Sequence, residues 1–137
     1  MRPRGYDFTS ACAFATDDGR PVALSAAERS ALLGQALDHR SLGAYWHVDR
    51  PGRDPLRIVR TPLVPADERR MFGSPVAWIE PAAATPGTAY LTVTRLDATS
   101  TRATLTLAYP VEGVVGTFTF RRPRATWELV QGVVSER

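Results

Sequence analysis

The last fifty residues of the chain alternate between apolar and polar side chains, and this alternation constrains the fold more than any other feature. In the run TRATLTLAY, residues 101–109, Ala103, Leu105, Leu107 and Tyr109 fall on one face and threonines on the other. A period of two residues is typical of a β-strand that buries one face. Three further runs share the pattern, namely residues 88–96, 116–122 and 125–134.

Short polar connections join these four runs. The first two are separated by DATS, residues 97–100, a four-residue turn sequence that predicts a hairpin. The third and fourth are joined through RRPR, residues 121–124. In the fourth run we expect Trp127, Leu129 and Val133 to share the buried face. Consecutive strands with short links predict a four-stranded antiparallel meander.

The segment SAAERSALLGQALDHR begins with a signal for the N-terminus of a helix. Ser25 is followed three residues later by Glu28, the spacing of a capping box in which each side chain bonds the other residue's backbone N–H. We expect a helix from Ser25 to His39, with Gly43 just beyond its end. Its buried stripe should consist of Leu32, Leu33, Ala36 and Leu37.

The middle of the chain is less regular, because seven of the eleven prolines fall between residues 43 and 86. Proline lacks a backbone donor, so long helices are disfavoured and strands should be short or at an edge. We expect short strands in AYWHV, LRIVRT and VAWIE, one helical turn in PADERRMF, and a further strand over residues 6–15 near the N-terminus.

These elements predict one α+β domain over residues 1–137. One principal N-terminal helix packs on a strongly twisted antiparallel sheet, which combines the C-terminal four-stranded meander with short extra strands. The helix has one apolar stripe and therefore needs an apolar face to cover. The second face or an edge of the sheet is then open to a second copy, so a homodimer through the sheet is possible.

The order of a helix before a long meander that ends in ATWELV resembles the cystatin-like and NTF2-like group of small α+β domains. The resemblance covers the helix and residues 88–137, and it lies in element order. It implies a sheet curved around the helix. NTF2-like enzymes place an acid–base pair inside such a cone, which is what the resemblance implies for catalysis here.

Titratable side chains are most concentrated in LDHRSLGAYWHVDR, residues 37–50, which contains both histidines of the chain. His39 falls in the last helical turn, where it can bond a free carbonyl and favour the negative end of the helix dipole. If AYWHV is a strand, Trp46 and Val48 point into the core, while His47 and Asp49 share the opposite face. An imidazole held by a carboxylate is the arrangement of a general base, although a solvated strand face would carry the same residues.

Candidate partner contacts are aromatic residues and arginines, the types that dominate interface energetics. They are Trp46, Arg57, Trp78, Tyr90, Arg121, Arg122 and Arg124. Core packing explains the tryptophans equally well, and solvated loops explain the arginines. If the RRPR arginines converge with Arg50, Arg53, Arg57 and Arg60, they would form a basic patch for phosphate or an acidic protein.

Composition narrows the function classes. All 17 basic residues are Arg and the chain has neither Lys nor Asn. This usage indicates a GC-rich bacterial genome, although an Arg-specific role in bidentate phosphate or carboxylate binding would produce the same preference for Arg over Lys. The net charge of +3 is small and acids are mixed among the bases, so nucleic acid is an unlikely partner. The spacing of His39, His47 and the single Cys12 matches no metal motif, and Gly113 and Gly116 in VEGVVG suit turn and bulge geometry rather than a phosphate loop. We therefore expect no metal and no cofactor.

No segment approaches the roughly 20 apolar residues of a membrane span. The chain as written is expected to be cytoplasmic, or periplasmic or secreted if a signal peptide has been removed. We expect a non-enzymatic bacterial binding or accessory protein that recognises a protein partner, of inhibitor, immunity or secretion-assembly type. The alternative is an NTF2-like small-ligand binder or enzyme that does acid–base chemistry with His47 and Asp49 in a cone-shaped pocket.

Overall fold

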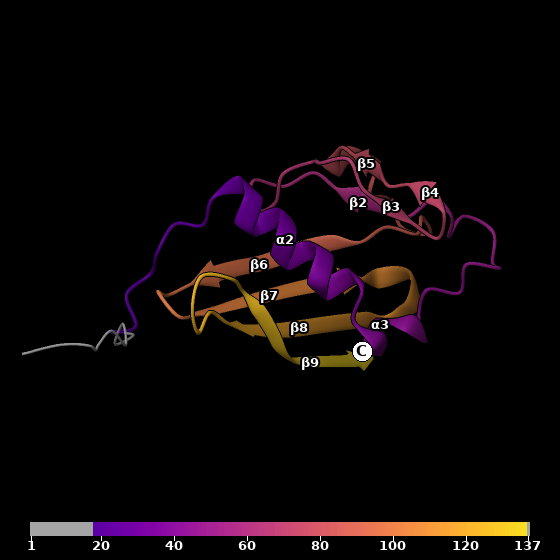
Figure 1. Cartoon of the computed structure of the whole chain (residues 1–137). Coiled ribbons are helices and arrows are strands. Elements are labelled where there is room, and N and C mark those ends of the chain that lie inside the picture. The colour runs from indigo at the N-terminus through magenta and orange to yellow at the C-terminus, as the bar shows by residue number, and fades with distance from the viewer. Residues whose placement is uncertain (1–17, 137) are drawn as a thin grey trace, which may run out of the picture.

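Four consecutive strands form the main sheet of the α+β fold, as the alternation predicts. The computed structural model describes residues 18–136. The sheet is antiparallel in the order β6–β7–β8–β9, and helix α2 lies across one of its faces (Figure 1). Its strands are β6 (Thr92–Ala98), β7 (Arg102–Tyr109), β8 (Val114–Arg121) and β9 (Glu128–Glu136).

Irregularities in register decide which side chains face the helix. The pairing shifts between Thr119 and Phe120 of β8, where Phe120 pairs with Leu129 and Thr119 pairs with Gln131. Between these two pairs β9 has one extra residue, Val130, that has no partner on β8, as in a β-bulge. Val133 then pairs with Thr117 on the outer face and is 53% exposed, so its predicted burial beside Trp127 is wrong.

The two glycines of VEGVVG differ in role. Gly113 has φ of 67°, a left-handed conformation that closes the turn between β7 and β8, as predicted. Gly116 sits in regular register opposite Leu107 and Val134, so the predicted bulge geometry is wrong. A Cβ there would lie 2.8 Å from the ring of Phe118, and its absence makes room for that ring.

Helix α2 spans Ala26–Leu37 and begins at the predicted capping box. Ser25 Oγ accepts from the backbone N–H of Glu28, and the Glu28 carboxylate accepts from the N–H of Ser25. Its predicted stripe is buried: Leu32, Leu33, Ala36 and Leu37. This stripe faces the inner side chains of the sheet, which include Leu105, Leu107, Phe118 and Phe120.

A polar contact also fastens α2 to the last strand. The Gln35 amide Nε2 donates to the carbonyl of Trp127 at 3.0 Å, and its Oε1 accepts from the N–H of Leu129 at 3.0 Å. The side chain therefore uses the same pair of backbone groups that a further strand would use. Gln35 therefore blocks strand pairing at the start of β9, the strand at this edge of the sheet.

A second, smaller group of strands lies next to the β6 edge of the main sheet. Strand β2 (Arg57–Val59) pairs in parallel with β5 (Ala77–Ile79), and it adjoins the main sheet where Leu91 bonds Arg57 and Val59. The hairpin of β3 (Arg70–Met71) and β4 (Ser74–Pro75) lies between them in sequence. These strands are only two or three residues long, as expected for a segment rich in proline. The remaining short elements are α3 (Arg40–Gly43), η1 (Pro81–Ala83) and η2 (Pro110–Glu112).

Two predictions for the middle segment are wrong. No strand covers residues 44–48, because α3 precedes them and His47 has φ of 47°, which turns the chain. Trp46 is buried as expected, but Val48 is 46% exposed. Residues 65–69 form no helical turn; they lead into β3, and Phe72 and Gly73 make the hairpin turn with positive φ.

The helix ends earlier than His39. Asp38 is its C-cap, and His39 is the N-cap of α3, where its Nδ1 accepts from the N–H of Ser41. The predicted bond of His39 to a free helix carbonyl is therefore replaced by an N-cap, and the ring packs edge-on against Phe118. The strand predicted for residues 6–15 and Cys12 lie outside the described residues. None of the helices within residues 18–136 is long and apolar enough to cross a membrane.

Candidate binding site

His47 pairs with Glu112 instead of Asp49. Its Nδ1 lies 2.8 Å from Oε2 of Glu112, which η2 presents at the turn between β7 and β8. Asp49 is exposed in the loop that follows. The predicted His47–Asp49 pair depended on strand geometry, and the left-handed backbone at His47 removes that geometry.

Glu112 is the centre of a cluster of donors. Nη1 of Arg50 lies 3.2 Å from the same Oε2 atom, and Nη1 of Arg53 also donates to it. Hydrogen bonds from His47 and Arg53 hold the pKa of the Glu112 carboxyl below its usual value, against the opposing effect of burial. One carboxylate thus accepts bonds from one imidazole and two guanidinium groups.

The hydroxyl of Tyr109 lies beside Arg53 and within the field of this cluster, but it makes no hydrogen bond of ordinary geometry. It is the one buried side-chain oxygen or nitrogen of residues 18–136 without a hydrogen-bond partner. Burial raises the pKa of Tyr109, while the positive charge and hydrogen-bonding donors of Arg53 lower it. The ring packs against Trp46 at 5.4 Å, which anchors it in the core.

Beside the cluster lies a hollow of about 330 Å³. Arg53 and Arg57 line one part of it, and its other walls are Pro51, Gly52, Gly87, Thr88, Ala89 and Val111. A neighbouring hollow of about 440 Å³ shares Gly87, Thr88 and Val111 and includes Tyr90. Two of the predicted partner residues, Arg57 and Tyr90, therefore lie along adjoining hollows.

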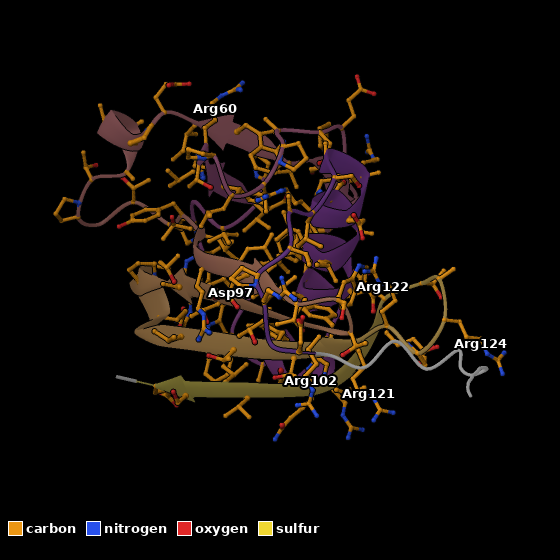
Figure 2. All side chains as sticks on the ribbon, turned by 90° about the vertical axis from the view of Figure 1, so that its left-hand side faces the viewer. Arg60, Asp97, Arg102, Arg121, Arg122 and Arg124 are labelled. Carbon is orange, nitrogen blue, oxygen red and sulfur yellow. The ribbon has the colours of Figure 1, made fainter. Side chains whose placement is uncertain are left out.

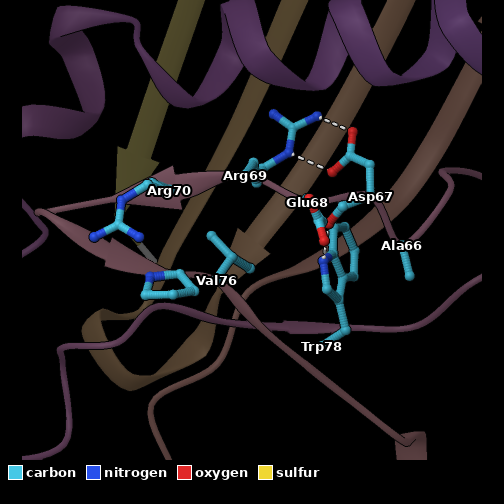
Figure 3. A pocket seen from close by; sticks show the side chains of 8 residues that line it. Ala66, Asp67, Glu68, Arg69, Arg70, Val76 and Trp78 are labelled. Atoms are coloured by element: carbon cyan, nitrogen blue, oxygen red, sulfur yellow. Dashed lines mark hydrogen bonds and ion pairs between the residues drawn. The ribbon is translucent and has the colours of Figure 1, made fainter.

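A separate groove of about 600 Å³ surrounds Trp78, a third predicted partner residue. In Figure 3, Val76 lies between Trp78 and Arg70, which occupy opposite ends of the groove. The indole Nε1 of Trp78 donates to the carbonyl of Asp67 at 2.7 Å, which fixes the ring at the wall. The other lining residues are Ala66, Asp67, Glu68, Arg69 and Pro75.

A polar network holds the wall of this groove in place. Nε and Nη2 of Arg69 bond the two carboxylate oxygens of Asp67 at 2.8 and 2.7 Å, and Ser30 of α2 also donates to Asp67. The bonds from Arg69 hold the pKa of Asp67 below its usual value. Because Arg69 also bonds the carbonyl of Ser30 at 2.9 Å, the groove wall is tied directly to the helix.

Two predicted partner residues have structural contacts instead. Trp46 is buried against Phe72 and Tyr109. The Arg122 guanidinium lies 4.5 Å from the centre of the Trp127 ring and bonds Glu28 at 2.9 Å. These contacts join the start of α2 to the β8–β9 connection, as a cation–π pair and an ion pair.

The two groups of arginines do not converge. Arg102 and Arg121 are cross-strand neighbours and are exposed at one end of the sheet, and Arg124 extends from the nearby loop (Figure 2). The cluster around Glu112 lies at the other end of β7, roughly 20–25 Å along the strand. Arg60 is paired with Glu80 on the β2–β5 layer.

The sequence pointed to individual residues but not to their neighbours. Glu112 is 65 residues from His47 in sequence, and Glu68 and Arg70 lie in a segment for which the sequence predicts a helical turn. A carboxylate at a predicted hairpin end was the one available signal for Glu112. Within residues 18–136, no three His, Cys, Asp or Glu side chains are grouped closely enough to hold a metal ion.

We compared the chain with known protein families, curated proteins and solved structures. No family model, curated protein or solved structure matches the chain.

Proposed function

We propose that the protein is a non-enzymatic binding protein that recognises a protein partner through the groove around Trp78. The observation that carries this proposal is the fixed indole ring at the groove wall, half-buried and held by its bond to Asp67. Tryptophan and arginine are enriched among the residues that dominate binding energy, and this groove contains both.

The chemistry of the groove suits an extended peptide segment. Pro75, Val76 and Trp78 offer apolar surface to a bulky apolar side chain. Arg70 is exposed at the far end, where its guanidinium bonds the carbonyl of Gly73 and keeps further donors for an acidic residue. We therefore expect a partner segment in which a bulky apolar residue is followed, toward Arg70, by Asp or Glu.

The enzymatic alternative has less support. A general base is oriented by a carboxylate that serves it, whereas Glu112 beside His47 is shared with Arg50 and Arg53. Asp49, its expected partner, is exposed in a turn. The same residues are better explained as an electrostatic cluster that holds residues 47–53 against the β7–β8 turn.

Selection of a phage-displayed random peptide library on the full chain tests the proposal. The wild-type protein should enrich peptides with a bulky apolar residue beside an acidic one. Arg70→Glu should enrich a basic residue in place of the acidic one, because the charge at that end is reversed. Arg70 is exposed, so this variant is expected to fold.

Arg40→Glu is the matched control, since Arg40 is also exposed but lies on α3 and does not line the groove. It should select the same peptides as the wild type. The proposal is wrong if no peptide family is enriched, or if the Arg70 and Arg40 variants change the selection equally.

A further inference from the structure

The hollow beside Glu112 contains guanidinium groups whose donors are not all used. Arg53 is only 8% exposed, and burial of a charged group is costly unless the group is paired. Its hydrogen bonds within the described chain account for Nη1 alone, which donates to Glu112. The guanidinium also acts on the Tyr109 hydroxyl, and because a guanidinium has five N–H donors, Arg53 keeps donors for a further acceptor.

Arg53 is one of the residues that line the hollow. No nitrogen of Arg53 is among the fully buried polar atoms that lack a partner within residues 18–136, so its free donors retain contact with open space. Arg57 lines the same hollow, and its Nη1 donates to the carbonyl of Gly52 at 2.7 Å, which orients the guanidinium. Two oriented guanidinium groups thus face one small space.

The balance of charge around the hollow is positive. Glu112 is the one carboxylate bonded within this cluster, and it is shared by His47, Arg50 and Arg53. The hydroxyl of Tyr109 lies beside Arg53, whose guanidinium acts on it, and within the field of Arg57. The bonded groups around the hollow therefore include more cationic side chains than carboxylates, which favours an anionic ligand.

We propose that this hollow binds a small oxyanion, the carboxylate or phosphate group of a low-molecular-weight ligand, through Arg53 and Arg57. Guanidinium groups match the planar arrangement of such oxygens and donate to them in pairs. The volume of about 330 Å³ lies at the lower end of the range for small-molecule sites. The site shares no lining residue with the groove around Trp78, so it does not depend on the proposed protein partner.

Titration of the full chain with inorganic phosphate and with succinate, followed by isothermal calorimetry at low ionic strength, tests this site. At least one probe should bind with one-to-one stoichiometry. Tighter binding of phosphate identifies a phosphate ligand class, and tighter binding of succinate identifies a carboxylate class. Either result supports the proposal. Arg57→Gln should weaken binding roughly 10-fold or more, because it removes a charge-assisted donor pair.

Arg60→Gln is the matched control, because Arg60 is exposed, three residues away, and pairs with Glu80 outside the hollow. It should bind the probe like the wild type. Thermal unfolding of both variants verifies that they fold, and Arg57 is chosen over the more buried Arg53 for this reason. The proposal is overturned if neither probe binds below about 10 mM, or if the two variants weaken binding equally.

Discussion

Gly132→Ala should destabilise the protein by steric conflict with His39. A Cβ on Gly132 would lie 2.8 Å from Cε1 of the His39 ring and 3.0 Å from both ring nitrogens. Ordinary contact between such atoms is about 3.5–4.0 Å, so the methyl group would overlap the ring by roughly 0.7 Å or more. Gly132 lies in β9, and its lack of a side chain lets α3 approach the strand.

The His39 ring has little room to withdraw. Its Nδ1 accepts from the N–H of Ser41 at 3.1 Å and lies 2.6 Å from Ser41 Oγ, and the ring contacts Phe118 at 5.6 Å between centroids. Overpacking of this kind costs about 1–3 kcal/mol, and loss of glycine freedom in the unfolded chain offsets about 0.4–1 kcal/mol. We expect a net loss of about 1–2 kcal/mol, or roughly 3–7 °C in Tm for a chain of 137 residues.

Urea and thermal unfolding followed by circular dichroism measure this loss. His39→Ala in the same background should relieve the conflict, so that the double mutant shows a coupling free energy of about 1 kcal/mol or more. Gly43→Ala is the control, because no atom lies within 4 Å of the added Cβ. Equal stability of the Gly132 variant and the wild type, or additive effects of the two substitutions, would refute the reasoning.

Three further predictions follow from contacts in the core and at the caps. Ser25→Ala removes a cap bond and should lower the free energy of unfolding by about 1 kcal/mol in urea titration; a change below about 0.3 kcal/mol would contradict the capping role. Tyr109→Phe should raise it by about 1 kcal/mol by removing a buried hydroxyl without a partner, and a loss would indicate a bond that the hydroxyl makes. The pKa of Glu112 is lowered by folding, so its contribution to stability is present above about pH 4.5 and is lost as the pH falls through the lower folded value. Urea unfolding between pH 7 and 3 should therefore show a smaller acid loss for Glu112→Gln than for the wild type, and equal acid losses would exclude this role.

The main sheet and helix were predictable because their signals are local. The alternation in β7 and β8 repeats every two residues, and the capping box occupies four consecutive positions. Each of these patterns is complete within one element. By contrast, the bulge in β9 has no side-chain signature, so the sequence placed Val133 on the wrong face.

The candidate sites were less predictable because they depend on backbone turns and distant partners. A positive φ, as at His47 and Phe72, is uncommon for residues with a side chain, and although histidine adopts it more often than most, neither residue type predicts it at a given position. The groove needed the hairpin turn at Phe72 and Gly73, and the cluster around Glu112 needed contacts across 59 to 65 residues. Arg57, Trp78 and Tyr90 were found by residue type, but their surroundings were not.

The bond between Gln35 and the last strand has a consequence for the newly made chain. The helix and its partner groups are separated by 92 and 94 residues. Ribosomes add roughly 5–20 residues per second, so α2 is synthesised roughly 5–20 s before Trp127 and Leu129. The strands that cover the apolar stripe of α2, β7 and β8, are also made after the helix. Until they emerge the stripe has no sheet to cover it, and chaperones that bind exposed apolar segments have several seconds in which to hold it.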